Sequence, residues 1–489
     1  MSASRIGLFL GPVLFLLIYF FVQPVGLSSE GASLLAVTVW IAVWWITEAI
    51  PIAATALLPL VLFPFTGIMG IKATSIPYSD PMVLLYMGGF MIAVSIEKWN
   101  LHKRIALNII YYLGTDLRRI ILGFMLATAF LSMWISNTAT TLMMLPIAIA
   151  VVSQISRKKE GVADTENKIG QSLMLGIAYS ASIGGIATII GTPTNIILVG
   201  VIKKTYGIEI GFGEWMLIGF PIAAGLLFLC WYYLVYMAYR FSSVLEMEGG
   251  RQEIRKQLLD LGAISEEEKR VLWVFVGVSV SWISRTFVLQ RFIPQLDDTL
   301  IALTGVLLLF VIPSKRAGKS KLLDWKVAEK IPWGILILFG GGLALASAFQ
   351  ETGLAKWIGE QFILLQNVPF WLFLLLIIAA VNFLTEITSN VATASMLLPI
   401  LAAVALAMGV HPFGLMVGAT LAASCAFMLP VATPPNAVVF GSGYLTIPAM
   451  IRTGIWMNFI SIFFVVALVL WLLPIIWDFN IYRFPSAWR

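Results

Sequence analysis

One short polar motif occurs twice in this chain, each time inside a long apolar stretch. Residues 133–146 read MWISNTATTLMMLP and residues 385–399 read TEITSNVATASMLLP, so one Ser-Asn pair recurs at a spacing of 253 residues (389 − 136). A second motif, GTPTN at 191–195, recurs as ATPPN at 432–436, 241 residues later (432 − 191). Matching polar motifs in the two halves of an apolar chain indicate an internal duplication, with the functional site where the repeats meet.

The composition excludes a soluble protein. Of the 489 residues, 60% are hydrophobic and 11% are charged, whereas about 25% of the residues of an ordinary soluble domain are charged. Because membrane-spanning helices satisfy their own backbone hydrogen bonds, the sequence predicts an all-α polytopic membrane protein. The net charge of +6 does not indicate a nucleic-acid partner, since an excess of Lys and Arg on cytoplasmic loops is sufficient to explain it.

Apolar runs along the chain predict about eleven transmembrane helices and two re-entrant hairpins. The hairpins are expected around 119–153 and 369–408, with the repeated Ser-Asn motif at their centres. One repeat runs from about residue 32 to 240 and the other from about 270 to 476, and an odd number of spans in each inverts the second relative to the first. With a cytoplasmic N-terminus the most basic stretches face the cytoplasm, so we expect a multi-pass protein of the plasma membrane, or of the inner membrane in a bacterium.

The four motifs have a chemistry that suits small ions. A helix broken inside the membrane exposes backbone N–H groups at the start of one half-helix and carbonyls at the end of the other. The N–H groups attract anions, while carbonyl, amide and hydroxyl oxygens suit a small hard cation. No Lys or Arg lies within the four motifs, so an anion bound there would need co-bound cations to neutralise it. Coupling to Na⁺ is therefore expected.

Two carboxylates, Glu48 and Glu386, also lie within apolar segments. Glu48 is expected at a helix end, whereas Glu386, three residues before Ser389, could tune a cation site, carry a proton or form a structural hydrogen bond. An enzyme has little support, because GSG at 441–443 is the only stretch that suggests a nucleophile and the sequence contains no HExxH motif. A passive channel is disfavoured, because two opposed hairpins that close on one site do not line a continuous pore.

Two further stretches are informative: residues 44–59 (WWITEAIPIAATALLP) and residues 88–107 (GGFMIAVSIEKWNLHKRIAL). Together with the motifs above, they resemble the divalent anion:sodium symporter (DASS) family, which includes the INDY-type di- and tricarboxylate transporters. The resemblance covers nearly the whole chain and favours the sodium-coupled branch. It implies a homodimer in which a scaffold holds the dimer and a transport domain moves across the membrane as an elevator. The scaffold would comprise 1–115 and 270–360, the transport domain 116–240 and 361–489, and a cytoplasmic connector 241–269.

The resemblance also implies the residues of the site. One Na⁺ site would use Ser132, Ser136, Asn137 and Gly191, and its counterpart would use Thr385, Thr388, Asn390 and Ala432. The substrate would lie against Asn137, Thr138, Asn390, Val391, Thr433 and Pro434. Val391 departs from the family pattern, since it replaces the hydroxyl that Thr138 supplies in the first repeat. This end of the site is therefore expected to be less selective.

The function that follows is the import of C4-dicarboxylates such as succinate, malate and fumarate, coupled to Na⁺ by an elevator mechanism. Two alternatives stay open at this point. The same site could support Na⁺-independent exchange of two dicarboxylates, or citrate or sulfate could be the main substrate.

Overall fold

The computed structural model describes residues 3–113, 116–156, 163–241, 248–315, 321–361 and 368–488. Within these ranges the regular secondary structure is helical, apart from an isolated β-bridge between Pro313 and Lys321. Nine of the described helices are long and apolar enough to cross a membrane, and shorter apolar helices accompany them. The chain is an all-helical, multi-span membrane protein, which confirms the class predicted from its composition.

The helices range from four to 30 residues in length. The first half contains α1 (Ala3–Phe21), α2 (Ser29–Thr47), α3 (Ile52–Thr55), α4 (Leu58–Phe65), α5 (Ile71–Ser75), α6 (Pro81–Lys98), α7 (Leu101–Leu113), α8 (Leu117–Ser132), α9 (Asn137–Ser156), α10 (Ala163–Ile186), α11 (Pro193–Tyr206) and α12 (Phe212–Tyr232). The second half contains α13 (Glu248–Asp260), α14 (Glu266–Ser284), α15 (Asp298–Val311), α16 (Trp325–Ala328), α17 (Trp333–Glu351), α18 (Leu354–Gln361), α19 (Phe370–Leu384), α20 (Asn390–Met408), α21 (Pro412–Ala423), α22 (Pro434–Phe440) and α23 (Ile447–Ile476).

The order of helices repeats at the spacing of the motifs. α6 to α9 begin at residues 81, 101, 117 and 137, and α17 to α20 begin at 333, 354, 370 and 390, which is 252 or 253 residues later (333 − 81, 390 − 137). In each half the Ser-Asn motif separates two helices, because its serine caps the second one. Ser136 Oγ accepts a hydrogen bond from Ala139 N at 3.2 Å, and Ser389 Oγ accepts one from Ala392 N at 3.5 Å. A serine at this position stabilises a helix start inside an otherwise apolar stretch.

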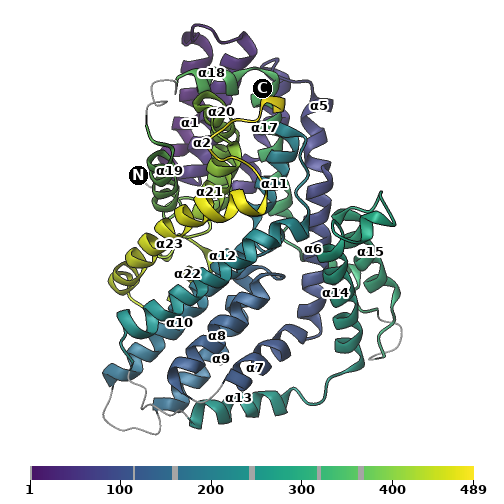
Figure 1. Cartoon of the computed structure of the whole chain (residues 1–489), viewed down its shortest axis with the longest axis vertical. Helices are drawn as coiled ribbons and strands as arrows, with labels where there is room; N and C mark the ends of the chain where they lie inside the picture. Colours follow the sequence, from purple (N-terminus) through teal and green to yellow (C-terminus); the bar gives the residue numbers. More distant parts are fainter. Residues whose placement is uncertain are drawn as a thin grey trace.

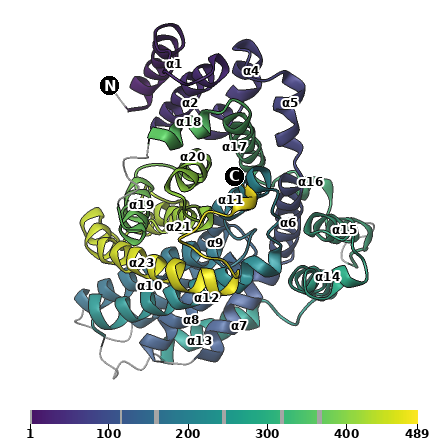
Figure 2. The same ribbon diagram turned by 45° about the horizontal axis from the view of Figure 1, so that its top comes forward.

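The apolar side chains form two cores of unequal size. The smaller core is built mainly from α1, α2, α4, α17 and α18, and the larger one joins α6 to α15 with α19 to α23. Figure 1 shows α1, α2, α17 and α18 at one end of the molecule and α7, α8, α9 and α13 at the other. In Figure 2, α14 and α15 stand beside α6, away from α8 and α10.

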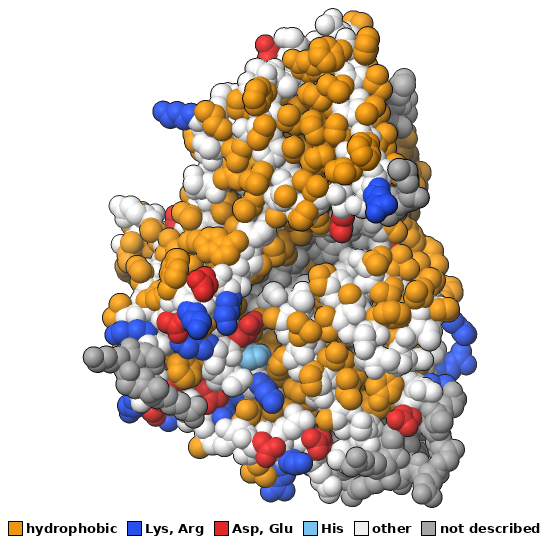
Figure 3. Space-filling model, turned by 180° about the vertical axis from the view of Figure 1, so that it is seen from behind, with side chains coloured by type: hydrophobic (Ala, Val, Ile, Leu, Met, Phe, Trp, Pro, Cys, Tyr) orange, Lys and Arg blue, Asp and Glu red, His pale blue; other side chains and the backbone are white. Residues whose placement is uncertain are grey.

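Much of the outer surface is apolar. Figure 3 shows one face on which hydrophobic side chains cover most of the described area, with charged groups gathered towards its lower part. Large side chains such as Phe65, Trp273 and Trp471 are 85%, 74% and 77% exposed, respectively. A soluble monomer rarely exposes such extensive apolar surface, so this surface is suited to contact with lipid.

Candidate functional site

A cavity of about 800 Å³ lies where the two Ser-Asn motifs meet two breaks between helices, each followed by a proline. The first break lies between α10 and α11, and the second between α21 and α22. Most of the residues that the sequence singled out line it: Ser136, Asn137, Thr138, Gly191, Thr388, Asn390, Val391, Ala432, Thr433 and Pro434. The other two, Ser132 and Thr385, are fully buried at the ends of α8 and α19. The structure thus brings together motifs that are about 250 residues apart in the chain.

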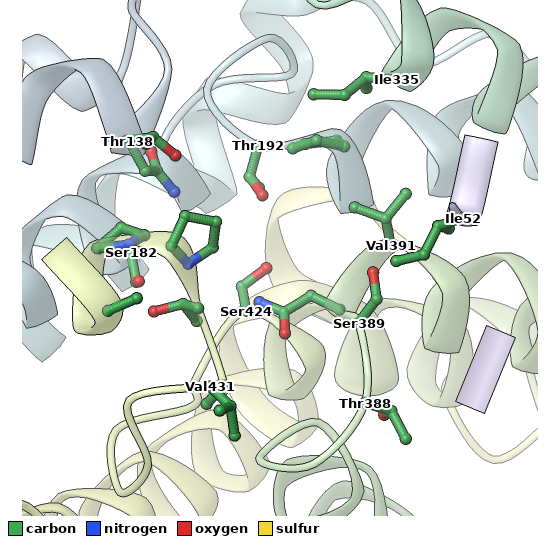
Figure 4. A pocket seen from close by; sticks show the side chains of 18 of the residues that line it. Ile52, Thr138, Ser182, Thr192, Ile335, Thr388, Ser389, Val391, Ser424 and Val431 are labelled. Atoms are coloured by element: carbon green, nitrogen blue, oxygen red, sulfur yellow. The ribbon is translucent and has the colours of Figure 1, made fainter. Parts of the chain in front are cut away.

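The cavity also contains residues that the motifs did not reveal. Ser182 and Ser424 add hydroxyl groups from the ends of α10 and α21, and Ile52 and Ile335 add apolar side chains. In Figure 4 Ser182 lies on the side of Thr138, whereas Ile52 lies beside Val391 on the opposite side. The repeated motifs could not identify Ser182 or Ser424, because neither has a serine at the corresponding position of the other repeat, 241 residues away.

Helix starts and uncharged groups dominate the lining. α9 begins at Asn137, α11 at Pro193 and α20 at Asn390, and all three residues line the cavity. Their free backbone N–H groups and aligned peptide dipoles make such helix starts suitable for anions. Among the described residues that line the cavity, Glu48 is the only charged one. It ends α2, as expected from the sequence.

The asparagine of each proline-containing motif holds the break that precedes it. Asn195 Nδ2 donates to the carbonyl oxygens of Gly185 and Thr188, ten and seven residues earlier, at 3.2 and 2.8 Å. Asn436 Nδ2 donates in the same way to the carbonyl oxygens ten and seven residues earlier, at 3.2 and 3.0 Å. Both side chains are fully buried. The two breaks therefore keep the same internal geometry: in each, backbone carbonyls that have left the helical hydrogen-bond pattern accept hydrogen bonds from the side-chain amide of the asparagine.

Glu386 supports the second break through a set of hydrogen bonds. Its carboxylate accepts from the backbone N–H groups of Phe427 at 2.7 Å, Met428 at 3.0 Å and Leu429 at 3.0 Å, and from Asn458 Nδ2 at 2.8 Å. Both carboxylate oxygens act as acceptors. This pattern fits the acceptor-only, ionised form of the side chain. Of the three roles that the sequence left open for Glu386, the geometry favours the structural one.

Two hydrogen bonds join the repeats beneath the cavity. The hydroxyl oxygens of Thr194 and Ser424 lie 2.8 Å apart, and Tyr179 Oη donates to the carbonyl of Phe427 at 2.8 Å. All four residues are buried. Because these contacts connect the two breaks directly, the two halves of the cavity are expected to move as one body.

We call residues 132–140, where α8 ends and α9 begins, the first tip, and residues 385–393, between α19 and α20, the second tip. The first tip offers oxygens to a cation. Ser132 Oγ and Asn137 Oδ1 are buried and have no hydrogen-bond partner among the described residues. Buried polar atoms are nearly always paired with protein, water or an ion. Hydroxyl, amide and carbonyl oxygens are the ligands that hard cations prefer, so these residues fit a Na⁺ ion carried as a substrate.

Comparison with known proteins agrees with this chemistry. A sequence model described as the sodium:sulfate symporter transmembrane region matches residues 2–477. The sodium-dependent dicarboxylate transporter SdcS of Staphylococcus saprophyticus is 49% identical, with 96% of this chain and 91% of the relative covered. SdcS of Staphylococcus aureus (strain bovine RF122) is 47% identical, with 98% and 93% covered.

Solved structures share the fold at low sequence identity. The transporter YdaH of Alcanivorax borkumensis superimposes with a TM-score of 0.59 at 14% identity, covering 89% of this chain and 98% of the other. MtrF of Neisseria gonorrhoeae gives a TM-score of 0.56 at 11% identity, covering 96% and 95%. Since the family match extends over nearly the whole chain, the protein belongs to the sodium:sulfate symporter family, a family of membrane transporters and not of enzymes.

Proposed function

We propose that this protein imports C4-dicarboxylates such as succinate, malate and fumarate by coupling them to Na⁺. One observation carries the proposal: helix starts that suit an anion and unpartnered oxygens that suit a cation meet in one cavity without Lys or Arg among the described lining residues. An anion with two charges is costly to hold in such a site unless cations are bound with it. The names of the SdcS relatives support both the dicarboxylate and the sodium dependence.

The substrate is placed between the two tips. Asn137, Thr138, Asn390 and Thr433 would supply amide, hydroxyl and backbone donors to the two carboxylates, with Pro434 and Val391 as apolar neighbours. The cations are placed behind the tips, the first with Ser132, Ser136, Asn137 and Gly191, and the second with Thr385, Thr388, Asn390 and Ala432. The dense packing of these residues around one cavity supports the assignment.

The transport cycle is proposed to be an elevator movement. Residues 116–240 and 361–489 would form a transport domain with two re-entrant hairpins, α8–α9 and α19–α20, and residues 1–115 and 270–360 a scaffold. The scaffold would hold a homodimer, and 241–269 would connect the parts in the cytoplasm. The matching order of helices in the two halves supports inverted repeats with about eleven spans.

The cavity extends to the start of α1 and the end of α2. Ala3, Thr47 and Glu48 line it, and Ala3 is the first described residue. If the N-terminus is cytoplasmic, as the distribution of basic residues favours, this conformation is open to the cytoplasm. It is then the state from which Na⁺ and the dicarboxylate would be released.

Uptake of labelled succinate into proteoliposomes tests the proposal. Vesicles would be prepared without internal substrate or preloaded with unlabelled succinate, each with an inward gradient of Na⁺ or of K⁺. We expect uptake into unloaded vesicles only with Na⁺, loss of that uptake in Asn137→Ala, and its retention in Thr128→Val. Thr128 is a matched control, since its buried hydroxyl bonds only to the backbone of its own helix. Uptake restricted to preloaded vesicles and indifferent to Na⁺ would identify an exchanger instead, and preferential uptake of citrate or sulfate would revise the substrate.

A further inference from the structure

The hydrogen bonding of the two tips differs, although their sequences correspond. In the first tip Ser132 Oγ, Asn137 Oδ1 and Thr140 Oγ1 are buried atoms with no hydrogen-bond partner among the described residues. The side chains of Ser132 and Thr140 are 0% and 1% exposed. Asn137 and Thr140 are three residues apart at the start of α9, so their side chains share one face of the helix. Three unpaired oxygens in such a short segment are unusual in a folded protein.

Gly185 faces the side-chain amide of Asn137 and the backbone of the first break. A Cβ atom placed on this glycine would lie 2.9 Å from the carbonyl oxygen of Gly191, 3.0 Å from Asn137 Oδ1 and 3.1 Å from Asn137 Nδ2. The glycine therefore leaves a space of about one atom beside this amide and this carbonyl. Amide and carbonyl oxygens are among the ligands that a hard cation such as Na⁺ prefers.

The oxygens at the corresponding positions of the second tip bond to one another. Thr385, 253 residues after Ser132 (385 − 132), donates its hydroxyl to Asn390 Oδ1 at 2.5 Å. Thr393, the counterpart of Thr140 (393 − 140), lies 2.8 Å from the hydroxyl of Thr388. Thr140 has no such neighbour in the first repeat, because Ile135 stands at the position that corresponds to Thr388 (388 − 253). These side chains of the second tip thus hydrogen-bond to one another, whereas the corresponding side chains of the first tip do not.

We propose that the two cation sites are filled in a fixed order, and that Thr140 is an additional ligand of the first. The first site binds Na⁺ in the conformation described here, because Ser132 Oγ, Asn137 Oδ1 and Thr140 Oγ1 are already without hydrogen-bond partners among the described residues. The second site binds only after the Thr385–Asn390 hydrogen bond has been exchanged for a cation contact. This inference rests on the proposed sodium coupling and adds a ligand and a binding sequence to it.

The physical reason for the order is the hydrogen bond that must be broken. A cation that reaches Asn390 Oδ1 has to displace the hydroxyl proton of Thr385, which can turn to the carbonyl oxygen of Ala423 at 3.1 Å. The exchange therefore lowers the affinity by at most roughly twofold to tenfold, the equivalent of one net hydrogen bond. No such exchange is needed at Asn137 Oδ1, which has no partner to lose. At low Na⁺ concentration the first site is therefore occupied to a greater extent than the second.

Thermal melting of the purified full-length protein against Na⁺ concentration tests the order, with choline replacing Na⁺ at constant ionic strength. A ligand at concentration c that binds only the folded state stabilises it by RT ln(1 + c/Kd), so the melting temperature begins to rise where the Na⁺ concentration approaches the dissociation constant. We expect Thr140→Val to shift the Na⁺ concentration needed for stabilisation upward by about tenfold, the effect of losing one ligand to a charged group. Thr140→Ser, which keeps the hydroxyl, and the control Thr128→Val should follow the wild-type Na⁺ dependence even if their melting temperatures in choline differ.

The second site is tested with Thr385→Val in the same titration, with and without succinate. We expect the onset of stabilisation at low Na⁺ to be unchanged and the extra stabilisation by succinate to be lost. A wild-type Na⁺ dependence in Thr140→Val would refute the added ligand, and equal shifts of the low-Na⁺ onset in Thr140→Val and Thr385→Val would refute the order. A wild-type protein that shows neither Na⁺-dependent melting nor Na⁺-dependent uptake would instead overturn the proposed function itself.

Discussion

The carboxylate of Glu386 is predicted to be required for the shape of the second break. Glu386→Gln keeps the size of the side chain but replaces one acceptor oxygen by an amide NH₂ group. That group would face the backbone N–H donors of Met428 and Leu429, which lie 3.1 and 3.0 Å from the present oxygen. The backbone N–H groups of Met428 and Leu429 would then face an N–H donor instead of an acceptor, so the backbone of the second break would have to shift.

The magnitude follows from the contacts that are lost. A hydrogen bond to a charged group contributes about 1.5–3 kcal/mol, so the loss of two amounts to at least about 3 kcal/mol of local stabilisation. Because the neutral side chain no longer carries a buried charge, the loss of global stability is expected to be smaller, about 1–2 kcal/mol. The local term acts on Leu429, whose carbonyl also accepts from Asn436, and hence on the adjoining cation and substrate site. If it acts fully on binding, 3 kcal/mol corresponds to a loss of about 100-fold in affinity.

Two measurements separate the loss of global stability from the loss of substrate affinity. They are the melting temperature and the succinate concentration for half-maximal Na⁺-driven uptake. Glu214→Gln is the matched control, since Glu214 accepts from the backbone N–H of Gly211 in a helix cap outside the cavity lining. We expect the control to show a modest loss of stability and wild-type substrate affinity. Wild-type uptake and melting of Glu386→Gln would refute the reasoning and show that an ionised carboxyl is not needed there.

Three further predictions concern the site and its surroundings. Val391→Thr restores a hydroxyl at the second tip and should shift the ratio of succinate to citrate uptake by roughly twofold to tenfold; an unchanged ratio would contradict a role in selectivity. Gly185→Ala should lower Na⁺-driven uptake at least tenfold because its Cβ fills the space between Asn137 Oδ1 and Gly191 O, whereas Gly277→Ala, with open space around it, should transport normally. In the loop before α12, burial raises the pKa of Glu209, but Arg285 and Lys203 lower it more, so that the net pKa lies below its usual value. The stabilisation from this carboxylate is therefore present at neutral pH and lost as the pH falls through the lowered pKa. Melting curves of Glu209→Gln should accordingly depend less on pH in the acid range, and an unaltered acid limb would refute the assignment.

The sequence predicted the parts of the site that are duplicated. The Ser-Asn pairs at 136–137 and 389–390 were informative because the same motif recurs at one spacing in two apolar segments, whereas one such motif alone could as well join or kink packed helices. The prediction that these motifs meet in one place is borne out by the cavity that they line. The division into scaffold and transport domain, the dimer and the orientation in the membrane remain predictions.

The parts that have no repeat counterpart could not be predicted. Ser182, Ser424 and Ile52 reach the cavity only through the packing of helices, and a single side chain on an apolar helix carries no sign of which way it faces. For Glu386 the sequence left three roles open, because its partners at 427–429 are about 40 residues further along the chain. The described residues contain nine long apolar helices and several shorter ones, such as α15 and α21, which are too short to be recognised as spans by length alone. A count of spans from apolar runs is approximate for this reason.

The two breaks are stabilised by different residues, and this has a consequence for the ancestry of the chain. In the first repeat Thr188 donates to the carbonyl of Met133 at 2.5 Å and accepts from Gly191 N at 3.0 Å. In the second, Glu386, at the position that corresponds to Met133 (386 − 133 = 253), receives the backbone N–H groups directly. Each break is thus held by residues of its own half: Thr188 with Met133 and Gly191 in the first, and Glu386 with residues 427–429 and Asn458 in the second. Since the duplication, these residues have therefore been constrained to change as a set within one repeat and not in step with their counterparts in the other.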